Sequence, residues 1–216
     1  EKFFPAEKII MTGNPVRQGL RNHHISREDA IRSFGLDPSK KTILIVGGSL
    51  GARTINNCVM EGLDKIKASG AQFIWQTGKI YIGEARAAVA QAGELPMLHV
   101  TDFISDMAAA YSAADLIISR AGAGSISEFC LLQKPVIQVP SPNEAEDHQT
   151  KNALALVNKN AALYIKDAAA KEALLDKAVE TVKQPETLKS LSTNIAKLAF
   201  TASASVIARE VFKLAD

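Results

Sequence analysis

The chain has 216 residues, of which 47% are hydrophobic and 22% charged, and its formal net charge is +2. This balance is typical of a globular protein and excludes disordered, collagen-like and coiled-coil classes. Lys and Arg are interspersed rather than clustered, so no nucleic-acid partner is expected, and no apolar run reaches the roughly 18 residues of a membrane span.

Residues 1–40 are expected to hold one helix, over Arg27 to Phe34. Ser26 is suited to cap its start, and Gly35 stands where such a helix ends. The chain opens at Glu1 without a methionine, in the stretch EKFFPAEKIIMTGNPVR. We therefore expect it to be a fragment of a longer protein.

Short apolar runs rich in β-branched residues then alternate with helical patterns, such as the spacing of Ile55, Val59, Leu63 and Ile66. Strands that are apolar on both sides, each followed by a helix, predict a parallel sheet covered on both faces. Right-handed crossovers make this an α/β fold with a Rossmann-like, doubly wound sheet of about six strands. The runs are TILIVGG (42–48), QFIWQTG (72–78), MLHVTDF (97–103), DLIISRAG (115–122), KPVIQVP (134–140) and AALYIKD (161–167).

Residues after about 168 look helical throughout, with a break at Pro185. The last pattern, at about 203–214, is an amphipathic helix whose apolar face needs a partner. That partner is either this domain or a part of the protein outside the chain. No repeat or long linker separates two cores, so residues 1–216 are expected to form a single domain. Cys58 and Cys130 both lie in apolar helical stretches and fit a reducing compartment.

The first candidate for chemistry is the loop GGSLGA, at 47–52, directly after a strong strand. Ligands of an open parallel sheet bind at the carboxyl ends of its strands. Glycines such as Gly48 let the backbone approach a ligand, and with Ser49 they precede a helix N-terminus that suits a diphosphate. The loop is neither a Walker A motif nor a G-x-G-x-x-G motif. A tight turn without a ligand is the alternative interpretation.

The second candidate is SRAGAGSISE, at 119–128, which repeats the layout of strand, small residues and helix. If an anion is held between Gly48 or Ser49 and Gly122–Ser125, Glu128 lies too far along the helix to touch it without repulsion but near enough to reach an attached sugar. The Glu128 carboxylate could instead accept from the two hydroxyls of an attached ribose, at roughly 1.5–3 kcal/mol for each bond. The alternative is a first-turn Glu that favours the helix dipole by about 0.3–1 kcal/mol.

Two further stretches carry polar groups with less defined roles. Arg17, in TGNPVR, carries a planar cation that is suited to bind a phosphate. The alternative is that Arg17 is an ordinary solvated surface residue. His148 is not expected to bind metal, because no second His or Cys lies at ligand spacing, and His23 and His24 are expected on the surface. The loop VPSPNEAEDHQTKNA offers groups for sugar hydroxyls, or simply a polar surface: Asn143, Glu144, Asp147, His148, Gln149 and Asn152.

The motifs TGNPVR, GGSLGARTIN, VTDFISDMAAAYSAADLIISRAGAGSISE and DHQTKNA together resemble the carboxyl-terminal half of the MurG family, in glycosyltransferase family 28. The resemblance runs from about Phe4 to Val211. It implies one half of a GT-B glycosyltransferase, namely the domain that binds the sugar nucleotide. The last helix would then pack on the amino-terminal half, which is not in this chain.

The resemblance also implies contacts with UDP-N-acetylglucosamine (UDP-GlcNAc). Arg17, Gly48 and Ser49 would face the diphosphate, and Ile104, after Phe103, would bond the uracil through its backbone. Some relatives have Gln in place of His148, and a bulkier residue or Gln in place of Leu50 and Gly124. The remaining implied contacts are to the phosphates from Gly122, Ala123, Gly124 and Ser125, to the ribose from Glu128, and to the GlcNAc hydroxyls from His148 and Gln149.

The activity implied is inverting transfer of GlcNAc to undecaprenyl-pyrophosphoryl-MurNAc-pentapeptide in peptidoglycan synthesis, at the cytoplasmic side of the bacterial inner membrane. No cofactor or obligatory metal is implied. The acceptor, the membrane surface and an acceptor-side His would belong to the missing amino-terminal half. The fragment should therefore bind the donor without turning it over.

Three alternatives remain at this point. The chain could be a stand-alone donor-binding subunit of a two-component GlcNAc transferase, or a domain like that of UDP-GlcNAc 2-epimerases. A nucleotide sensor or dehydrogenase-type domain would need an acid at the end of the second strand. That strand instead ends in Gln76, Thr77 and Gly78, which speaks against NAD.

Overall fold

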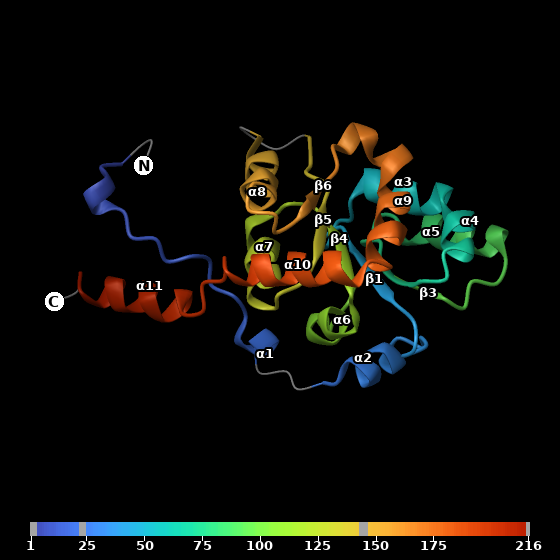
Figure 1. Ribbon diagram of the computed structural model, residues 1–216, viewed down its shortest axis with the longest axis horizontal. Helices are drawn as coiled ribbons and strands as arrows, with labels where there is room; N and C mark the ends of the chain where they lie inside the picture. The colour runs from blue at the N-terminus through green and yellow to red at the C-terminus, as the bar shows by residue number, and fades with distance from the viewer. Residues whose placement is uncertain (1–3, 22–24, 143–146, 215–216) are drawn as a thin grey trace.

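The computed structural model describes residues 4–21, 25–142 and 147–214. His23, His24, Asn143 and Glu144, which the sequence singled out, lie outside the described residues. The described chain forms an α/β fold in which helices cover both faces of one sheet (Figure 1).

The sheet has six strands in the order β3-β2-β1-β4-β5-β6, and every pair is parallel. This confirms the predicted doubly wound sheet. All residues of β1, β2, β4 and β5 are buried, which explains why these strands are mainly apolar on both faces. The order reverses between β1 and β4, and ligands of such sheets bind at this switch point. The strands are β1 (Thr42–Val46), β2 (Gln72–Gln76), β3 (Leu98–Thr101), β4 (Leu116–Ser119), β5 (Val136–Gln138) and β6 (Leu163–Tyr164).

Two apolar cores flank the sheet. One packs α3 (Arg53–Glu61), α4 (Leu63–Ala68), α5 (Ile82–Ala92) and α9 (Ala170–Val182) on one face, and it includes Cys58. The other packs α2 (Arg27–Ser33), α6 (Met107–Ala113), α7 (Ala123–Leu131) and α8 (His148–Val157) on the opposite face, and it includes Cys130. Both thiols are buried and unpaired, as expected.

The helix boundaries agree with the local signals in the sequence. The hydroxyl of Ser26 accepts from the backbone N–H of Asp29 at 3.1 Å, and Gly35 has a φ of 71° just after α2. Pro185 is the first residue of α10 (Pro185–Ala196), a position where its missing N–H costs nothing. The short segments η1 (Ala6–Lys8), α1 (Gln18–Arg21) and η3 (Asp167–Ala169) were not predicted.

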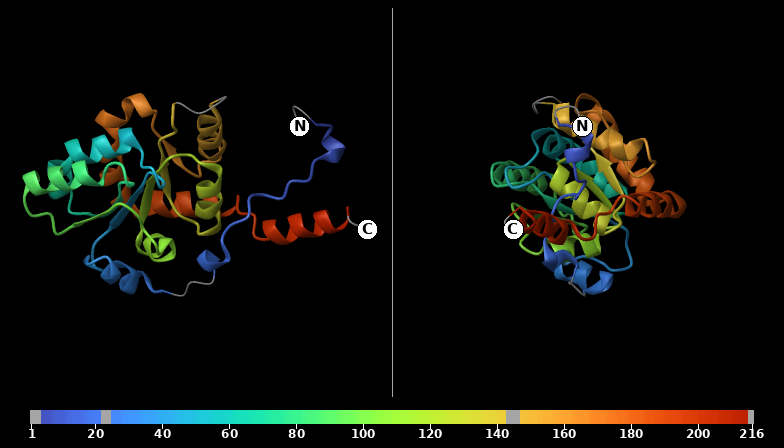
Figure 2. Two further views of the ribbon diagram at one scale, coloured as in Figure 1. Left: turned by 180° about the vertical axis from the view of Figure 1, so that it is seen from behind. Right: turned by 90° about the vertical axis from the view of Figure 1, so that its left-hand side faces the viewer.

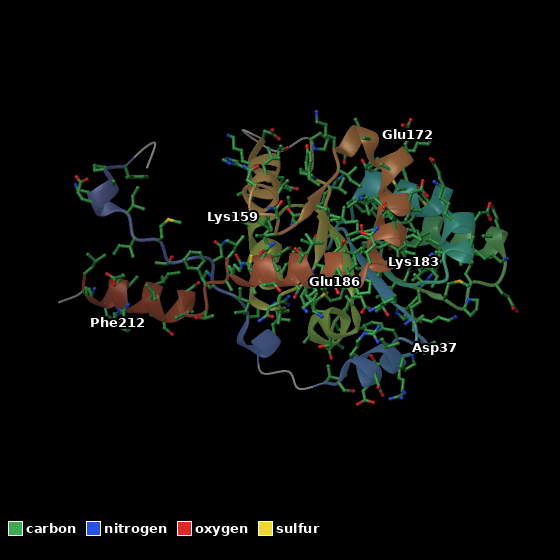
Figure 3. The ribbon with its side chains drawn as sticks, viewed as in Figure 1. Asp37, Lys159, Glu172, Lys183, Glu186 and Phe212 are labelled. Atoms are coloured by element: carbon green, nitrogen blue, oxygen red, sulfur yellow. The ribbon has the colours of Figure 1, made fainter. Side chains whose placement is uncertain are left out.

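The last helix, α11 (Ser203–Phe212), leaves the body of the fold on the same side as the amino-terminal segment (Figures 1 and 2). Phe212 lies near its far end, away from the sheet, and is 71% exposed (Figure 3). The two segments approach each other near their base, where a Cβ built at Gly13 would lie 2.5 Å from Phe200 and 2.8 Å from Ser203. None of the described helices combines the length and apolarity needed to cross a bilayer.

Candidate functional site

A cavity of about 580 Å³ opens at the carboxyl ends of β1, β2 and β4, at the switch point of the sheet. It is lined from three directions: the loop after β1, the loop between β3 and α6, and the start of α7. The predicted site residues that line it are Arg17, Gly48, Ser49, Phe103, Ile104, Gly122, Gly124, Ser125 and Glu128. The tertiary fold thus brings together residues from three of the four motifs.

The glycine loop after β1 is shaped by close backbone packing. Gly51 has a φ of 84°, and a Cβ there would lie 2.1 Å from the carbonyl oxygen of Thr77. Gly78 has a φ of 79°, and its Cβ would lie 2.3 Å from the N atom of Gly51. Only glycine fits this contact, so the loop is held against the end of β2. Because α3 begins only at Arg53, the loop itself, rather than the helix tip, borders the cavity.

The start of α7 borders the cavity from the other side. Its N-cap is Gly122, and no side chain caps its first-turn amides. A Cβ built at Gly122 or Gly124 would have no atom within 4 Å, so these glycines leave open space rather than relieve crowding. Uncapped amides beside open space are a suitable site for an anion.

Glu128 lies in this cavity and has two partners. Its Oε2 accepts from the hydroxyl of Tyr111 at 2.7 Å, and its Oε1 pairs with the guanidinium of Arg17 at 3.3 Å. Its side chain is only 15% exposed, and it is the sixth residue of α7, beyond the first turn where the helix dipole acts. The helix-dipole interpretation of Glu128 therefore does not fit its position.

Two side chains that were not predicted as site residues brace the cavity. The amide of Gln76 donates to the carbonyl oxygens of Gly48, at 2.9 Å, and Asp102, at 3.0 Å. It therefore ties the glycine loop to the loop that carries Phe103 and Ile104. In that loop Phe103 is 55% exposed at the rim, whereas Ile104 is buried.

Arg120 is the second brace, and it places a positive charge in the cavity wall. Its guanidinium is ion-paired with Asp167 and donates to the carbonyl oxygens of Val139 and Pro140. Asp167 in turn accepts from the hydroxyl of Thr54 on α3 at 2.8 Å. This network joins the ends of β4 and β5 to α3. Arg120 lies within a quoted motif, but its partners are distant in sequence.

Three predicted residues do not line this cavity. Ala123 lines a neighbouring cavity of about 650 Å³ on the other side of α7. His148 and Gln149 begin α8, which follows β5 rather than β4 and so starts farther from the switch point. The Oε1 of Gln149 accepts from the backbone N–H groups of Ala121, at 3.1 Å, and Ser141, at 3.0 Å. That oxygen therefore holds the loops after β4 and β5 together.

The charge in the cavity is mixed, and Glu128 is the one acid among the described lining residues, beside Arg17 and Arg120. Within residues 4–21, 25–142 and 147–214, no three His, Cys, Asp or Glu side chains are grouped to hold a metal ion. The charged side chains that line the described cavity are therefore two guanidinium groups and one carboxylate.

Comparisons with known proteins show the family and the fold of the chain. A relative from Phocaeicola vulgatus, a UDP-N-acetylglucosamine–N-acetylmuramyl-(pentapeptide) pyrophosphoryl-undecaprenol N-acetylglucosamine transferase, is 95% identical over 216 residues, which are all of this chain and 57% of the relative. The crystal structure of Acinetobacter baumannii MurG matches with a TM-score of 0.74 and 27% identity, over 97% of this chain and 58% of that one.

A putative UDP-N-acetylglucosamine 2-epimerase from Listeria monocytogenes has a TM-score of 0.68 at 14% identity, over 97% of this chain and 54% of that one, and shows the shared fold alone. The chain thus spans a little over half the length of the relatives it matches. The family model "Glycosyltransferase family 28 C-terminal domain" matches residues 42–208. The chain therefore belongs to glycosyltransferase family 28 and carries the carboxyl-terminal domain of that family.

Proposed function

We propose that this chain binds UDP-GlcNAc in the 580 Å³ cavity, as the donor domain of an inverting N-acetylglucosaminyltransferase. One observation carries the proposal: the glycine loop after β1 and the uncapped start of α7 border a single cavity that also contains the carboxylate of Glu128. Family membership and the transferase names of the relatives support it.

The diphosphate would lie between Ser49 and the start of α7, where unpaired amides and the positive end of the helix dipole favour an anion. Arg120 adds a positive charge to the same wall. Glu128 would accept from the ribose hydroxyls, and charge-assisted bonds of this kind are about twice as strong as neutral ones. The Ile104 backbone, beside Phe103, would bond the uracil edge.

The GlcNAc would extend from the diphosphate toward the start of α8. His148 and Gln149 lie there, one strand beyond the cavity, and we propose that they face the sugar hydroxyls. Ala123, the first residue of α7, would offer its backbone to the phosphates. These contacts require the ligand to reach past the nucleotide cavity and toward α8.

In the proposed reaction a hydroxyl of the lipid-linked muramoyl-pentapeptide attacks the anomeric carbon of GlcNAc. The bond from that carbon to the diphosphate oxygen breaks, the configuration inverts, and UDP leaves. The residues of this chain would stabilise the charge that develops on the diphosphate, through the amides of α7 and the guanidinium of Arg17. No step of this mechanism requires a metal.

We assign the acceptor site, the base that takes the hydroxyl proton, and the contact with the inner membrane to the part of the protein outside this chain. The protein would then act at the cytoplasmic face of the membrane in peptidoglycan synthesis. The chain by itself is expected to bind donor without turnover.

The test is calorimetric titration of the 216-residue chain with UDP-GlcNAc, UDP, ADP and NADH. Uridine ligands are expected to bind more tightly than the adenine ligands. Equal affinity for UDP and ADP would contradict the proposal, because the Phe103–Ile104 loop would then not read the base.

Substitution of Glu128, whose carboxylate is proposed to bind the ribose, gives a second test. Glu128→Ala is expected to weaken UDP binding by about 10- to 100-fold, the loss of one or two hydrogen bonds to a charged group. Glu172→Ala, which removes an exposed carboxylate on α9, is the matched control and should bind as the parent chain does. An unchanged affinity of Glu128→Ala would count against the ribose role.

A further inference from the structure

Tyr111 contacts Glu128 but is itself almost shielded from solvent. It lies on α6, it is 3% exposed, and its hydroxyl is 2.7 Å from Oε2 of Glu128 on α7. Its ring packs edge-on against Phe129, with 5.8 Å between centroids and 90° between planes. Because the ring is held on a neighbouring apolar side chain, the direction of the hydroxyl is set by packing.

The two oxygens of Glu128 therefore face different surroundings. Oε2 is turned toward the buried hydroxyl of Tyr111, whereas Oε1 meets the guanidinium of Arg17, whose side chain is 67% exposed. An ion pair with an exposed partner is weak and gives way readily to a competing ligand. Oε1 is thus the oxygen that a ligand entering the cavity can reach.

We propose that Tyr111 is a positioning residue for ribose recognition, which holds Oε2 of Glu128 so that Oε1 accepts from the ribose hydroxyls once Arg17 is displaced. The inference rests on the proposed function and extends it to Tyr111, which lines the same cavity and acts through Glu128. It also explains why the buried oxygen of Glu128 has a neutral partner rather than a cation.

The protonation of Tyr111 is compatible with this role. Burial raises the pKa of Tyr111 far above its ordinary value, and the hydrogen bond to Glu128 raises the pKa further, against a smaller opposing effect of Arg17. The hydroxyl therefore remains a donor throughout the neutral range. An ionised carboxylate only accepts, so this donor matches it.

Loss of the hydroxyl should change the orientation of the carboxylate. Without a donor at Oε2, Glu128 is free to turn both oxygens toward Arg17, and guanidinium groups favour such two-point pairing. The carboxylate would then present poor geometry to the ribose. The loss should be greatest for ligands that carry both ribose hydroxyls.

The experiment compares UDP with 2′-deoxy-UDP on the 216-residue chain and its variants, by calorimetry. The parent chain is expected to prefer UDP by about tenfold or more, the equivalent of one charged hydrogen bond. Tyr111→Phe keeps the ring packing and is expected to weaken UDP binding about tenfold and 2′-deoxy-UDP binding less. The preference should then fall to about threefold or below. Tyr164→Phe, on β6 and outside the cavity, should match the parent chain.

The outcomes separate positioning from simple packing. Equal weakening of both nucleotides by Tyr111→Phe, with the preference unchanged, would overturn the inference, as would an unchanged affinity for UDP. In a Glu128→Gln background, Tyr111→Phe should have little further effect on UDP binding, since the partner carboxylate is gone. If the parent chain binds neither nucleotide, the proposed function fails and the inference with it. If the parent chain binds UDP well but Tyr111→Phe leaves the preference for UDP over 2′-deoxy-UDP unchanged, the inference alone fails.

Discussion

Replacing Gln76 with Leu is expected to weaken the brace between the two loops that line the cavity. The Gln76 amide donates to the carbonyl oxygens of Gly48 and Asp102 at 2.9 and 3.0 Å, and the residue is only 5% exposed. Leu has nearly the same size but no donor. Gln76→Leu therefore removes both bonds while largely keeping the packing.

The magnitude follows from the two bonds. Each hydrogen bond contributes about 0.5–1.5 kcal/mol net, and a buried carbonyl left without a donor costs about 1–3 kcal/mol. Part of that cost is recovered because the carbonyls border a cavity that water can enter, and because Leu buries apolar surface. We therefore expect the free energy of unfolding to fall by about 2 kcal/mol.

Urea unfolding followed by circular dichroism measures this change, and UDP titration measures its effect on the site. UDP binding should weaken about tenfold, since UDP spans both loops, whereas uridine, which needs only the base loop, should lose less. The matched control is Gln91→Leu, at an exposed position on α5. A loss of stability below about 0.5 kcal/mol, or equal losses for UDP and uridine, would refute the reasoning.

Two other predictions concern backbone strain and buried thiols. Gly78→Ala should lower the free energy of unfolding by more than about 2 kcal/mol, because its Cβ would lie 2.3 Å from the N atom of Gly51 at a φ of 79°; Gly83→Ala, in open space, is the control in the same thermal melts. Burial raises the pKa of Cys58 and Cys130 from 9.0 to about 11, so stability should fall as the pH rises from 9 to 11. Between pH 9 and 11, the urea concentration at the midpoint of unfolding should fall less in a double Cys→Ala variant than in the parent chain. The same dependence on pH in both proteins would contradict the prediction.

Local signals were sufficient for most of the sheet. Strands buried on both faces have mainly apolar residues, so β1, β2 and β4 could be predicted from their own residues. Right-handed crossovers then placed their carboxyl ends at one edge, and the glycine loops followed directly. Helix signals such as Ser26 and Pro185 also depend only on neighbouring residues, and both were confirmed.

Local signals failed where packing between distant segments decides. A second helix boundary, after Pro185, was not predicted: α10 ends at Ala196 and α11 begins at Ser203. The residues between them are rich in alanine, and this composition is typical of a helix. Similarly, nothing near Gln149 indicates that its Oε1 bonds the backbone N–H groups of Ala121 and Ser141. These partners lie in the loops after β4 and β5, and the local sequence does not show which loops pack together.

The sequence by itself determined the class of fold, the edge of the sheet where the cavity opens, and the types of residue gathered there, because apolar periodicity, glycines and helix starts act over a few neighbouring residues. The tertiary structure alone decided the partners of Glu128. Tyr111 lies on another helix, and Arg17 is 111 positions away in the chain. Their contacts depend on how α6, α7 and the amino-terminal segment pack around the end of the sheet, and no local spacing encodes a distance set by that packing.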